Sequence, residues 1–520
     1  MKLGLVTLCA ALTLGGSVFV ACGGDDSQAN GGSPDGGSGD GSQVAQDGSH
    51  PAHDGSMAAT DSALPIDGAM PGQDASTPVD GSTPVDGSLS VDGAVDGALP
   101  IDGASPTDAG LDAPAVLLDA DHGETSTVYP AFPPDLPQLV ENGGPTLKNP
   151  IIVTVTWDGD DGRPTYEGFG DGLGASGYWK TAVLEYGVTG ATSGAANHVH
   201  ITTPIPATIS DTDLQTLITM NHGKNGWPEV QDQILYAFFI PAATKLTGLG
   251  PGGDACSGGV GGYHDNLPAQ INGKWISYAV NLRCAMFSPN PSDVTATAAH
   301  EYGEASTDPF PSTKMPGPSL ADFDANHLNW EMFWGFLAEN GDVCNYPWAV
   351  VTELAPFPYT VQRLWSNASA MAGHDPCLPV VAEPNFGVTD FPADLDSVVV
   401  DLAAGGGSAT TPAKGYKVAL NTSRTFEVGY FSDAATTGPW AINAVYDPTQ
   451  SPITDMNGNP LTNGAMTISV DKPTGNNGEK AYVTVTPTAK GAGGVEFFFL
   501  RSVLPGGIQH HQQPIIISTP

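Results

Sequence analysis

Residues 23–125 offer almost nothing from which a hydrophobic core can be built. They hold eighteen Asp and one Glu, no Lys or Arg, and no Phe, Trp or Tyr. An apolar-Asp-Gly triplet recurs in part of this stretch, as in Val79–Gly81 and Val85–Gly87, but the repeat is too sparse for a calcium-binding roll. Such a composition cannot offset the entropy that folding costs. We therefore predict a long disordered, self-repelling tether, followed by a folded part from residue 126.

The first 22 residues are typical of an export signal. Lys2 supplies a positive start, an apolar run follows, and the segment ends in Phe19–Cys22, which resembles a bacterial lipobox. We expect Cys22 to be lipidated. The lipid would anchor the protein to a membrane of the bacterial cell envelope, outside the cytoplasm. An ordinary signal peptide or an uncleaved anchor is the alternative.

Charge and length narrow the classes of partner and the architecture. The chain has 520 residues and a formal net charge of -39, so phosphate backbones would repel it and nucleic acid is not an expected partner. A chain of this length exceeds what one core usually serves. Its oligomeric state is not encoded in any feature that we recognise.

Two folded regions are expected after the tether. Residues 126–379 mix strand patterns with helical spacing, for example the β-branched run 150–157 and the apolar run 234–240. Residues 380–520 carry only short strand patterns divided by turn residues, which favours a β-sandwich-like domain. The expected strands cover residues 397–402, 416–420, 425–430, 440–446, 465–470, 481–487, 494–503 and 514–518.

Four cysteines remain after the signal and the lipidation site. An even number in an exported protein predicts two disulfides. Three pairings are possible, and we favour Cys256 with Cys284 and Cys344 with Cys377. A structural zinc bound by four thiolates is the alternative, although no CxxC spacing supports it.

The segment His300–Glu304 (HEYGE) has the spacing of a metal-binding helix. Residues four apart lie on one helix face, so His300 and Glu304 can bind one ion while Glu301 faces an adjacent water. Zn²⁺ is the expected ion, and Glu301 the expected general base. The residues before the motif are small and uncharged, which predicts a buried helix, where ionisable groups are costly unless they bind something. A solvated surface helix is the alternative.

The third protein ligand is left open by the sequence. Asp308 would lie roughly 12 Å along an unbroken helix from His300 and could join only if the helix unwinds. Glu339 is the preferred candidate, and Asp342 is its near rival. His264 is a candidate donor to a reaction intermediate. The remaining histidines considered are weaker candidates: His198, His200, His222 and His327.

Several motifs between residues 145 and 379 resemble a group of secreted bacterial HExxE proteins, distantly similar to the plant exordium, or phosphate-induced protein, family. The motifs that carry the resemblance are Tyr178–Trp179, Glu185–Val188, Cys256, Tyr263–His264, His300–Pro309, Glu339–Cys344, Gln362–Asn367 and Cys377. The resemblance implies an α+β zincin-like metallopeptidase domain over residues 126–379. It also implies that His300 and Glu304 are metal positions and that Glu301 is the base.

Two functions of different classes are consistent with these patterns. The first is a lipid-anchored, extracytoplasmic zinc metallopeptidase that acts on peptide or protein substrates. The second is a non-catalytic cell-surface adhesin or binding protein, in which the metal site is structural or vestigial. Retention of Glu301 favours the first, because a structural ion needs no adjacent base.

Overall fold

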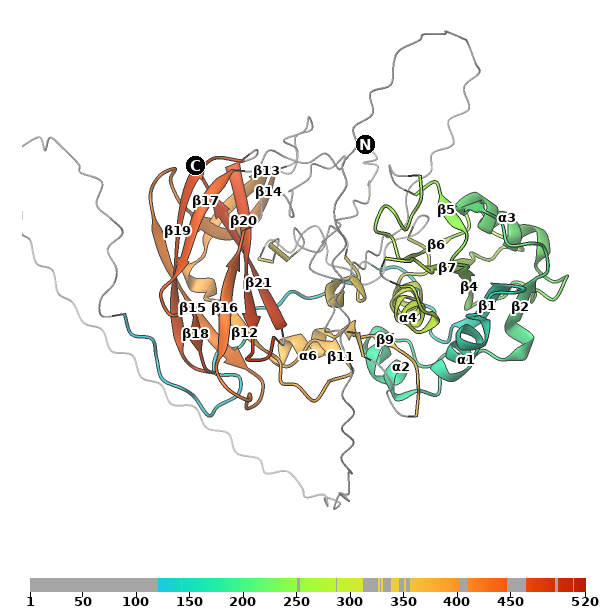
Figure 1. The fold of residues 1–520 in the computed structure, drawn as a ribbon, viewed down its shortest axis with the longest axis horizontal. Helices are drawn as coiled ribbons and strands as arrows, with labels where there is room; N and C mark the ends of the chain where they lie inside the picture. Colours follow the sequence, from blue (N-terminus) through green and yellow to red (C-terminus); the bar gives the residue numbers. More distant parts are fainter. Residues whose placement is uncertain are drawn as a thin grey trace, which may run out of the picture. The chain divides into compact units, whose positions relative to one another are not determined.

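The computed structural model describes most of the chain from residue 120 onward. The described residues are 120–520 except residues 142, 250–252, 287, 312–325, 328, 331–337, 346–349, 352–355, 402–409, 447–463, 492–493 and 508. They all belong to one of the two units into which the chain divides. Figure 1 shows their helices and strands, coloured along the sequence. The predicted signal peptide, the lipidation site Cys22 and the tether up to residue 119 lie outside the described residues. Within the described part, no helix combines the length and apolar character that a membrane span requires.

A five-stranded sheet forms the centre of the first part of the fold, between residues 151 and 282. Its strand order is β2 (His198–Ile201), β1 (Ile151–Trp157), β4 (Ile234–Ile240), β7 (Ser277–Leu282) and β6 (Gly262–Asn266). Neighbouring strands are parallel except for β6, which runs antiparallel to β7 at one edge. Every residue of β4 is buried, as expected for a central strand whose two faces are both covered.

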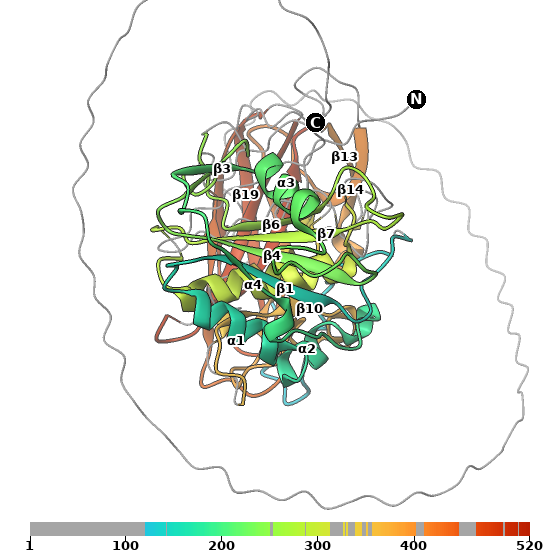
Figure 2. The ribbon, with the colours of Figure 1, turned by 90° about the vertical axis from the view of Figure 1, so that its right-hand side faces the viewer.

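Helices cover both faces of this sheet (Figure 2). Alternate strand residues pack with α3 (Asp211–Asn221) on one face. The other residues pack with α1 (Arg163–Leu173), α2 (Gly177–Ala182) and α4 (Pro291–Thr307) on the opposite face. The alternation follows from the two-residue period of a strand. The long motif helix α4 therefore lies against β6 and β7.

Two further sheets form the β-rich second part of the chain. The four-stranded sheet has the order β12 (Phe386–Asp390), β15 (Arg424–Ser432), β19 (Lys480–Ala489) and β17 (Ala465–Val470). The six-stranded sheet has the order β13 (Asp396–Asp401), β14 (Thr410–Lys417), β21 (Gln509–Ser518), β20 (Val495–Val503), β16 (Trp440–Val445) and β18 (Thr474–Gly475). Side chains of both sheets share one apolar core, and the predicted β-rich character is confirmed.

Short elements connect and brace these sheets. They are β3 (Thr208–Ser210) with β5 (Lys245–Thr247), β8 (Val350–Val351) with β9 (Val361–Gln362), β10 (Leu364–Trp365) with β11 (Cys377–Leu378), the helix α6 (Asn367–Met371), and the 3₁₀ turns η1 (Leu184–Tyr186), η2 (Ala195–Asn197), η3 (Asp342–Cys344) and η5 (Pro392–Asp394).

The chain before β1 contacts the β-rich part. The Ser126 amide donates to the Asn477 carbonyl at 2.7 Å, and the Lys480 amide donates to the His122 carbonyl at 2.7 Å. His122 was predicted to belong to the tether and Ser126 to the first domain, yet both contact the β-rich second part. The predicted boundary between residues 379 and 380 stays a prediction.

Both predicted disulfides are present. Cys256 is bonded to Cys284, and Cys344 is bonded to Cys377. Because all four described cysteines are oxidised, they cannot form a four-thiolate zinc site. Two disulfides fit a protein that folds in an oxidising compartment outside the cytosol.

A buried carboxyl in the second part should make stability depend on pH. Burial, then the charge of Asp135, raises the pKa of Asp390 to about 7. The carboxyl therefore holds its proton more tightly in the native state than in the unfolded chain, where the pKa of an Asp is about 3.9. The resulting stabilisation is complete below about pH 4 and is lost as the pH rises through 7.

Asp390→Asn should remove this part of the pH dependence. An Asn oxygen can still accept the hydrogen bond from Gln513 Nε2, which reaches Asp390 Oδ1 at 3.2 Å, while the buried charge is gone. We expect the variant to be more stable than the native protein at pH 8, by a few kcal/mol, and the two to converge near pH 4. Urea unfolding at both pH values measures this, and a native-like decline in the variant between them would contradict it.

Candidate metal centre

The motif HEYGE lies within α4, a helix that is buried over most of its length. Pro291 occupies the first turn, and the Asp293 carboxylate accepts from the Asn290 amide at 2.9 Å, which caps the helix start. Small side chains follow, so the helix can approach the sheet closely. Every residue from Val294 to Thr307 is buried. The predicted burial of the motif helix is therefore confirmed, and its ionisable side chains lie in the interior.

His300 and Glu304 converge as the four-residue spacing predicts. His300 Nε2 lies 3.1 Å from Glu304 Oε1. The turn η3 brings a third group, since Asp342 Oδ1 lies 3.7 Å from His300 Nε2 and the Asp342 amide donates to Glu304 Oε1 at 3.1 Å. These three side chains could hold one cation.

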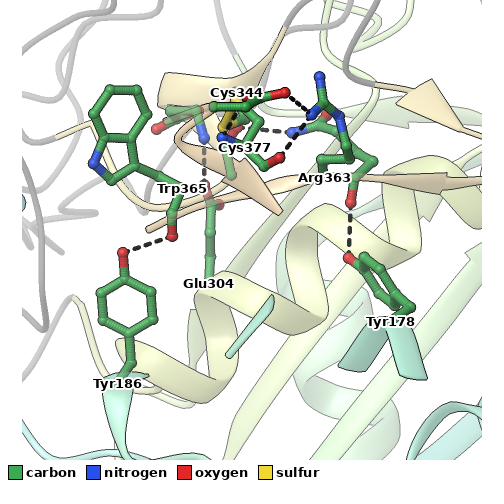
Figure 3. The surroundings of a disulfide bond; sticks show 11 residues. Tyr178, Tyr186, Glu304, Cys344, Arg363, Trp365 and Cys377 are labelled. Atoms are coloured by element: carbon green, nitrogen blue, oxygen red, sulfur yellow. Dashed lines mark hydrogen bonds and ion pairs between the residues drawn. A yellow bond between two sulfur atoms is a disulfide. The ribbon is translucent and has the colours of Figure 1, made fainter. Parts of the chain in front are cut away.

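A disulfide and two backbone contacts hold the turn that carries Asp342. Cys344, at the end of η3, is bonded to Cys377. Gln362 Nε2 donates to the Gly341 carbonyl at 2.7 Å, and the Trp365 amide donates to the Asn340 carbonyl at 2.8 Å. Figure 3 shows Glu304 extending from α4 toward the segment around this disulfide. The covalent bond and these contacts fix where the Asp342 carboxylate can lie.

His264 reaches the same cluster from the edge strand β6. Its Nδ1 lies 3.6 Å from Glu304 Oε2 and 3.8 Å from Glu301 Oε2. On the other side of the ring, Nε2 lies 3.0 Å from the Asp308 carbonyl oxygen and 3.6 Å from Glu339 Oε1. The imidazole therefore lies between the motif carboxylates on one side and the Asp308 carbonyl and Glu339 on the other.

Asp308 and Glu339, the two other candidates for the third ligand, both lie beside Nε2 of His264. The helix runs unbroken to Thr307 and Asp308 is its C-cap residue, so the unwinding that would carry its carboxylate back to His300 does not occur. Glu339 lies beside Nε2 of His264. Among the described residues, neither belongs to a group of three candidate ligands, whereas Asp342 does. Metal binding by Glu339 or Asp308 stays a prediction, and the geometry favours Asp342.

Burial and mutual charge set the proton affinity of these groups. Burial raises the pKa of Glu301, Glu339 and Asp342, and the charge of Glu304 adds to each shift. Burial is the largest single influence on Glu304 and would raise its pKa, but the charges and hydrogen bonds of His300 and His264 together lower the pKa to about 2. Burial alone would lower the pKa of His300, but the charge and hydrogen bond of Glu304, together with the charges of Glu301 and Asp342, raise it to about 10. A metal ion would therefore displace a proton from His300.

Several buried atoms of the cluster have a charged neighbour but make no well-aligned hydrogen bond with the described residues. They are His300 Nε2, His264 Nδ1, and both carboxylate oxygens of Glu301. Leaving such atoms unsatisfied in the interior is costly. Two imidazoles and three carboxylates are a donor set that suits Zn²⁺ or a similar divalent ion. The residues present therefore fit a metal ion.

Gly341 supplies the space that the cluster needs. A Cβ at this position would lie 2.7 Å from His300 Nδ1 and 2.8 Å from Glu304 Oε1. Both separations are shorter than van der Waals contact, so the methyl group of alanine would push the two side chains apart. Only glycine at this position leaves both ligands where they are.

Gly341→Ala should therefore weaken zinc binding without removing any ligand. We expect affinity to fall by about 10- to 100-fold, as for other changes that misorient ligands. Competition against a fluorescent zinc chelator measures it. Gly177→Ala is the matched control, because a Cβ there meets nothing within 4 Å. Equal affinities in the two variants would contradict the assignment.

The other histidines pair with carboxylates elsewhere. The contacts are His198 with Asp171 (2.9 Å), His200 with Glu167 (2.6 Å), His222 with Glu229 (3.4 Å) and His327 with Asp135 (3.3 Å). Across the described residues, none of these histidines joins a group of three candidate ligands. This geometry agrees with the prediction that these four histidines are weaker candidates than His300 and His264.

Comparisons with known proteins add little. No family model matches the chain, and no curated protein matches it. Two solved structures show a weak likeness: domains 4 and 5 of the S-layer protein SbsC, and domains 4–9 of the same protein. Each is 13% identical over 31% of this chain with a TM-score of 0.14, and the matches cover 80% and 25% of those structures respectively. Likeness at this level carries no argument about function.

Proposed function

We propose that the chain is an extracytoplasmic, metal-dependent hydrolase that cleaves peptide bonds. His300, Glu304 and Asp342 would hold Zn²⁺, and Glu301 would act as the general base. The observation that carries the proposal is the convergence of His300 Nε2, Glu304 Oε1 and Asp342 Oδ1 beside the buried carboxylate of Glu301, which accepts no hydrogen bond from the described residues. A motif helix packed on a mixed sheet supports the zincin-like fold as part of the same proposal.

The chain's own groups have separable tasks in this chemistry. A bound Zn²⁺ supplies a Lewis acid and lowers the pKa of water. Glu301 accepts the proton of the attacking water and passes it to the leaving amine. Its neighbour His264 orients the carboxylates of Glu301 and Glu304, from which its Nδ1 lies 3.8 and 3.6 Å, and is the candidate donor to the reaction intermediate. The surrounding apolar helix and sheet exclude bulk water, which strengthens these interactions.

Location is part of the proposal. The two disulfides support folding outside the cytosol. Lipidation of Cys22 and a long tether would place the folded part at a distance from the membrane, where it could reach exported proteins or wall peptides. The acidic β-rich part would hold a substrate or a partner.

Burial of the cluster favours a second function. Side-chain exposure is 0% for His264, 1% for Glu301 and 3% for His300, and only Asp342, at 18%, is appreciably open to solvent. A closed site is typical of an ion that braces a fold. The alternative is a cell-surface adhesin or binding protein whose metal is structural.

Metal removal distinguishes the two functions. The purified protein, with its disulfides intact, is incubated with a library of quenched fluorescent peptides before and after treatment with 1,10-phenanthroline, with 1,7-phenanthroline as the non-chelating control. The proposed enzyme cleaves peptides, loses cleavage on chelation and regains it with added Zn²⁺. Chelation that lowers only the thermal stability, in a zinc-loaded protein that cleaves none of the peptides, would instead support the structural role.

A further inference from the structure

The carboxylate of Glu304 faces two different sets of ligand atoms. Its Oε1 lies 3.1 Å from His300 Nε2, in the set completed by Asp342. Its Oε2 lies 3.6 Å from His264 Nδ1, in the set completed by Glu301. In each set, one atom from each residue lies within 4.8 Å of the others. A carboxylate placed in this way can bridge two ions.

The separations within each set match those around one ion. Bonds of about 2.1 Å in a tetrahedral zinc site place neighbouring ligand atoms about 3.4 Å apart. His300 Nε2 lies 3.1 Å from Glu304 Oε1 and 3.7 Å from Asp342 Oδ1. His264 Nδ1 lies 3.6 Å from Glu304 Oε2 and 3.8 Å from Glu301 Oε2. The second set is therefore as close to ligand geometry as the first.

His264 is oriented as metal-binding histidines are. Such residues usually donate the second ring N–H to a carbonyl or a carboxylate, which fixes the ring and its tautomer. His264 Nε2 lies 3.0 Å from the Asp308 carbonyl oxygen and 3.6 Å from Glu339 Oε1. This arrangement leaves Nδ1, which is buried and has no hydrogen-bond partner among the described residues, to face Glu301 and Glu304.

Charge points the same way. Four carboxylates lie within 4 Å of His264 or His300, and all are largely buried: Glu301, Glu304, Glu339 and Asp342. When all four are ionised and both imidazoles are neutral, one divalent ion balances two of these charges, and two divalent ions balance all four. Uncompensated charge in the interior is costly.

We propose that His264, Glu301 and Glu304 form a second divalent-cation site, joined to the His300–Glu304–Asp342 site by the bridging carboxylate of Glu304. Paired sites of this kind hold their ions about 3.5–4 Å apart. The inference rests on the first metal site of the proposed function. It also makes Glu301 a ligand at full metal load, so the second ion competes with its role as general base.

Metal stoichiometry tests the second site without an activity assay. The metal-free, disulfide-intact protein is dialysed against Zn²⁺, and bound metal is measured by mass spectrometry. We expect two ions per chain in the native protein, one in His264→Ala, one in His300→Ala, and none at this centre in Glu304→Ala. The double variant His198→Ala/His200→Ala controls for zinc on surface histidines and should keep two ions. Glu301→Gln provides a second loss at the new site if His264→Ala does not fold.

A spectroscopic arm tests the bridge itself. Two Mn²⁺ ions joined by a carboxylate give an exchange-coupled EPR signal, whereas isolated Mn²⁺ ions give independent six-line spectra. We expect the coupled signal in the native protein and its loss in His264→Ala. One zinc per chain, lost in His300→Ala and unchanged in His264→Ala, would overturn the second site and leave the proposed function standing. Two ions in a protein without hydrolase activity would overturn the proposed function and leave the second site standing.

Discussion

Glu301→Gln should abolish peptide hydrolysis while the protein still binds zinc through His300, Glu304 and Asp342. The amide has the size of the carboxylate but cannot accept a proton from water. Loss of a general base typically costs about 10²- to 10⁴-fold in turnover, and we expect kcat to fall within this range. Assays are made with one equivalent of Zn²⁺ per chain, so that the second site is not saturated, and bound metal is measured in the same samples.

Glu167→Gln is the matched control for this substitution. Glu167 lies on α1, and its ion-pair partners are His198 and His200, which are not part of the candidate centre, so the variant should hydrolyse peptides at the native rate. Unchanged turnover in Glu301→Gln would remove Glu301 from the reaction. Loss of both zinc and turnover in Glu301→Gln would show instead that Glu301 is needed to bind the first ion.

Arg363→Met should strongly destabilise the fold near the candidate centre. Arg363 is fully buried, and its Nη1 lies 2.5 Å from Asp375 Oδ2 and 2.7 Å from the Cys377 carbonyl oxygen. Removal of the guanidinium leaves a buried carboxylate without its counter-charge, which typically costs about 3–5 kcal/mol. Urea unfolding at pH 7 with the disulfides intact measures the loss.

The double variant Arg363→Met/Asp375→Leu separates charge from packing. Replacing both members of a buried ion pair with apolar groups is often neutral or stabilising, so the double variant should recover most of the lost stability. A double variant as unstable as Arg363→Met would contradict the charge argument. Native stability in Arg363→Met would show that the pair contributes little.

Local pattern was enough to predict much of the fold. The apolar run Ile234–Ile240 is the strand β4, and the run predicted over residues 150–157 is β1 with one residue fewer. Predicted strands of the second part correspond to β13, β15, β16, β17, β19, β20 and β21. These elements have strong periodicity and turn residues at their ends, which act over a few neighbouring residues.

Boundaries and long-range contacts were less accessible to sequence reasoning. Ser292 and Asp293 both look like helix caps, but α4 begins after Asn290, because Pro291 can occupy the first turn and Asp293 caps from within the helix. The pairing of Ser126 with Asn477 joins residues about 350 apart in the chain. No local pattern carries that information, since it depends on the packing of the whole unit.

The sequence was enough to predict that His300 and Glu304 lie together, but not which residue completes the group. The four-residue spacing of His300 and Glu304 follows from helix geometry alone. The choice between Glu339 and Asp342 depends on how the turn at Gly341 folds, and Gln362 and the Cys344 disulfide fix that turn. Gly341 between Asn340 and Asp342 was the available signal, because glycine permits a close approach to neighbouring side chains.

Anomalous scattering from crystals of the zinc-loaded protein, measured on both sides of the zinc absorption edge, tests the central claim most directly. We predict a peak about 2.0–2.2 Å from His300 Nε2, with carboxylate oxygens of Glu304 and Asp342 at similar distances. A zinc-loaded crystal whose anomalous peaks all lie away from His300 and Glu304 would contradict the account.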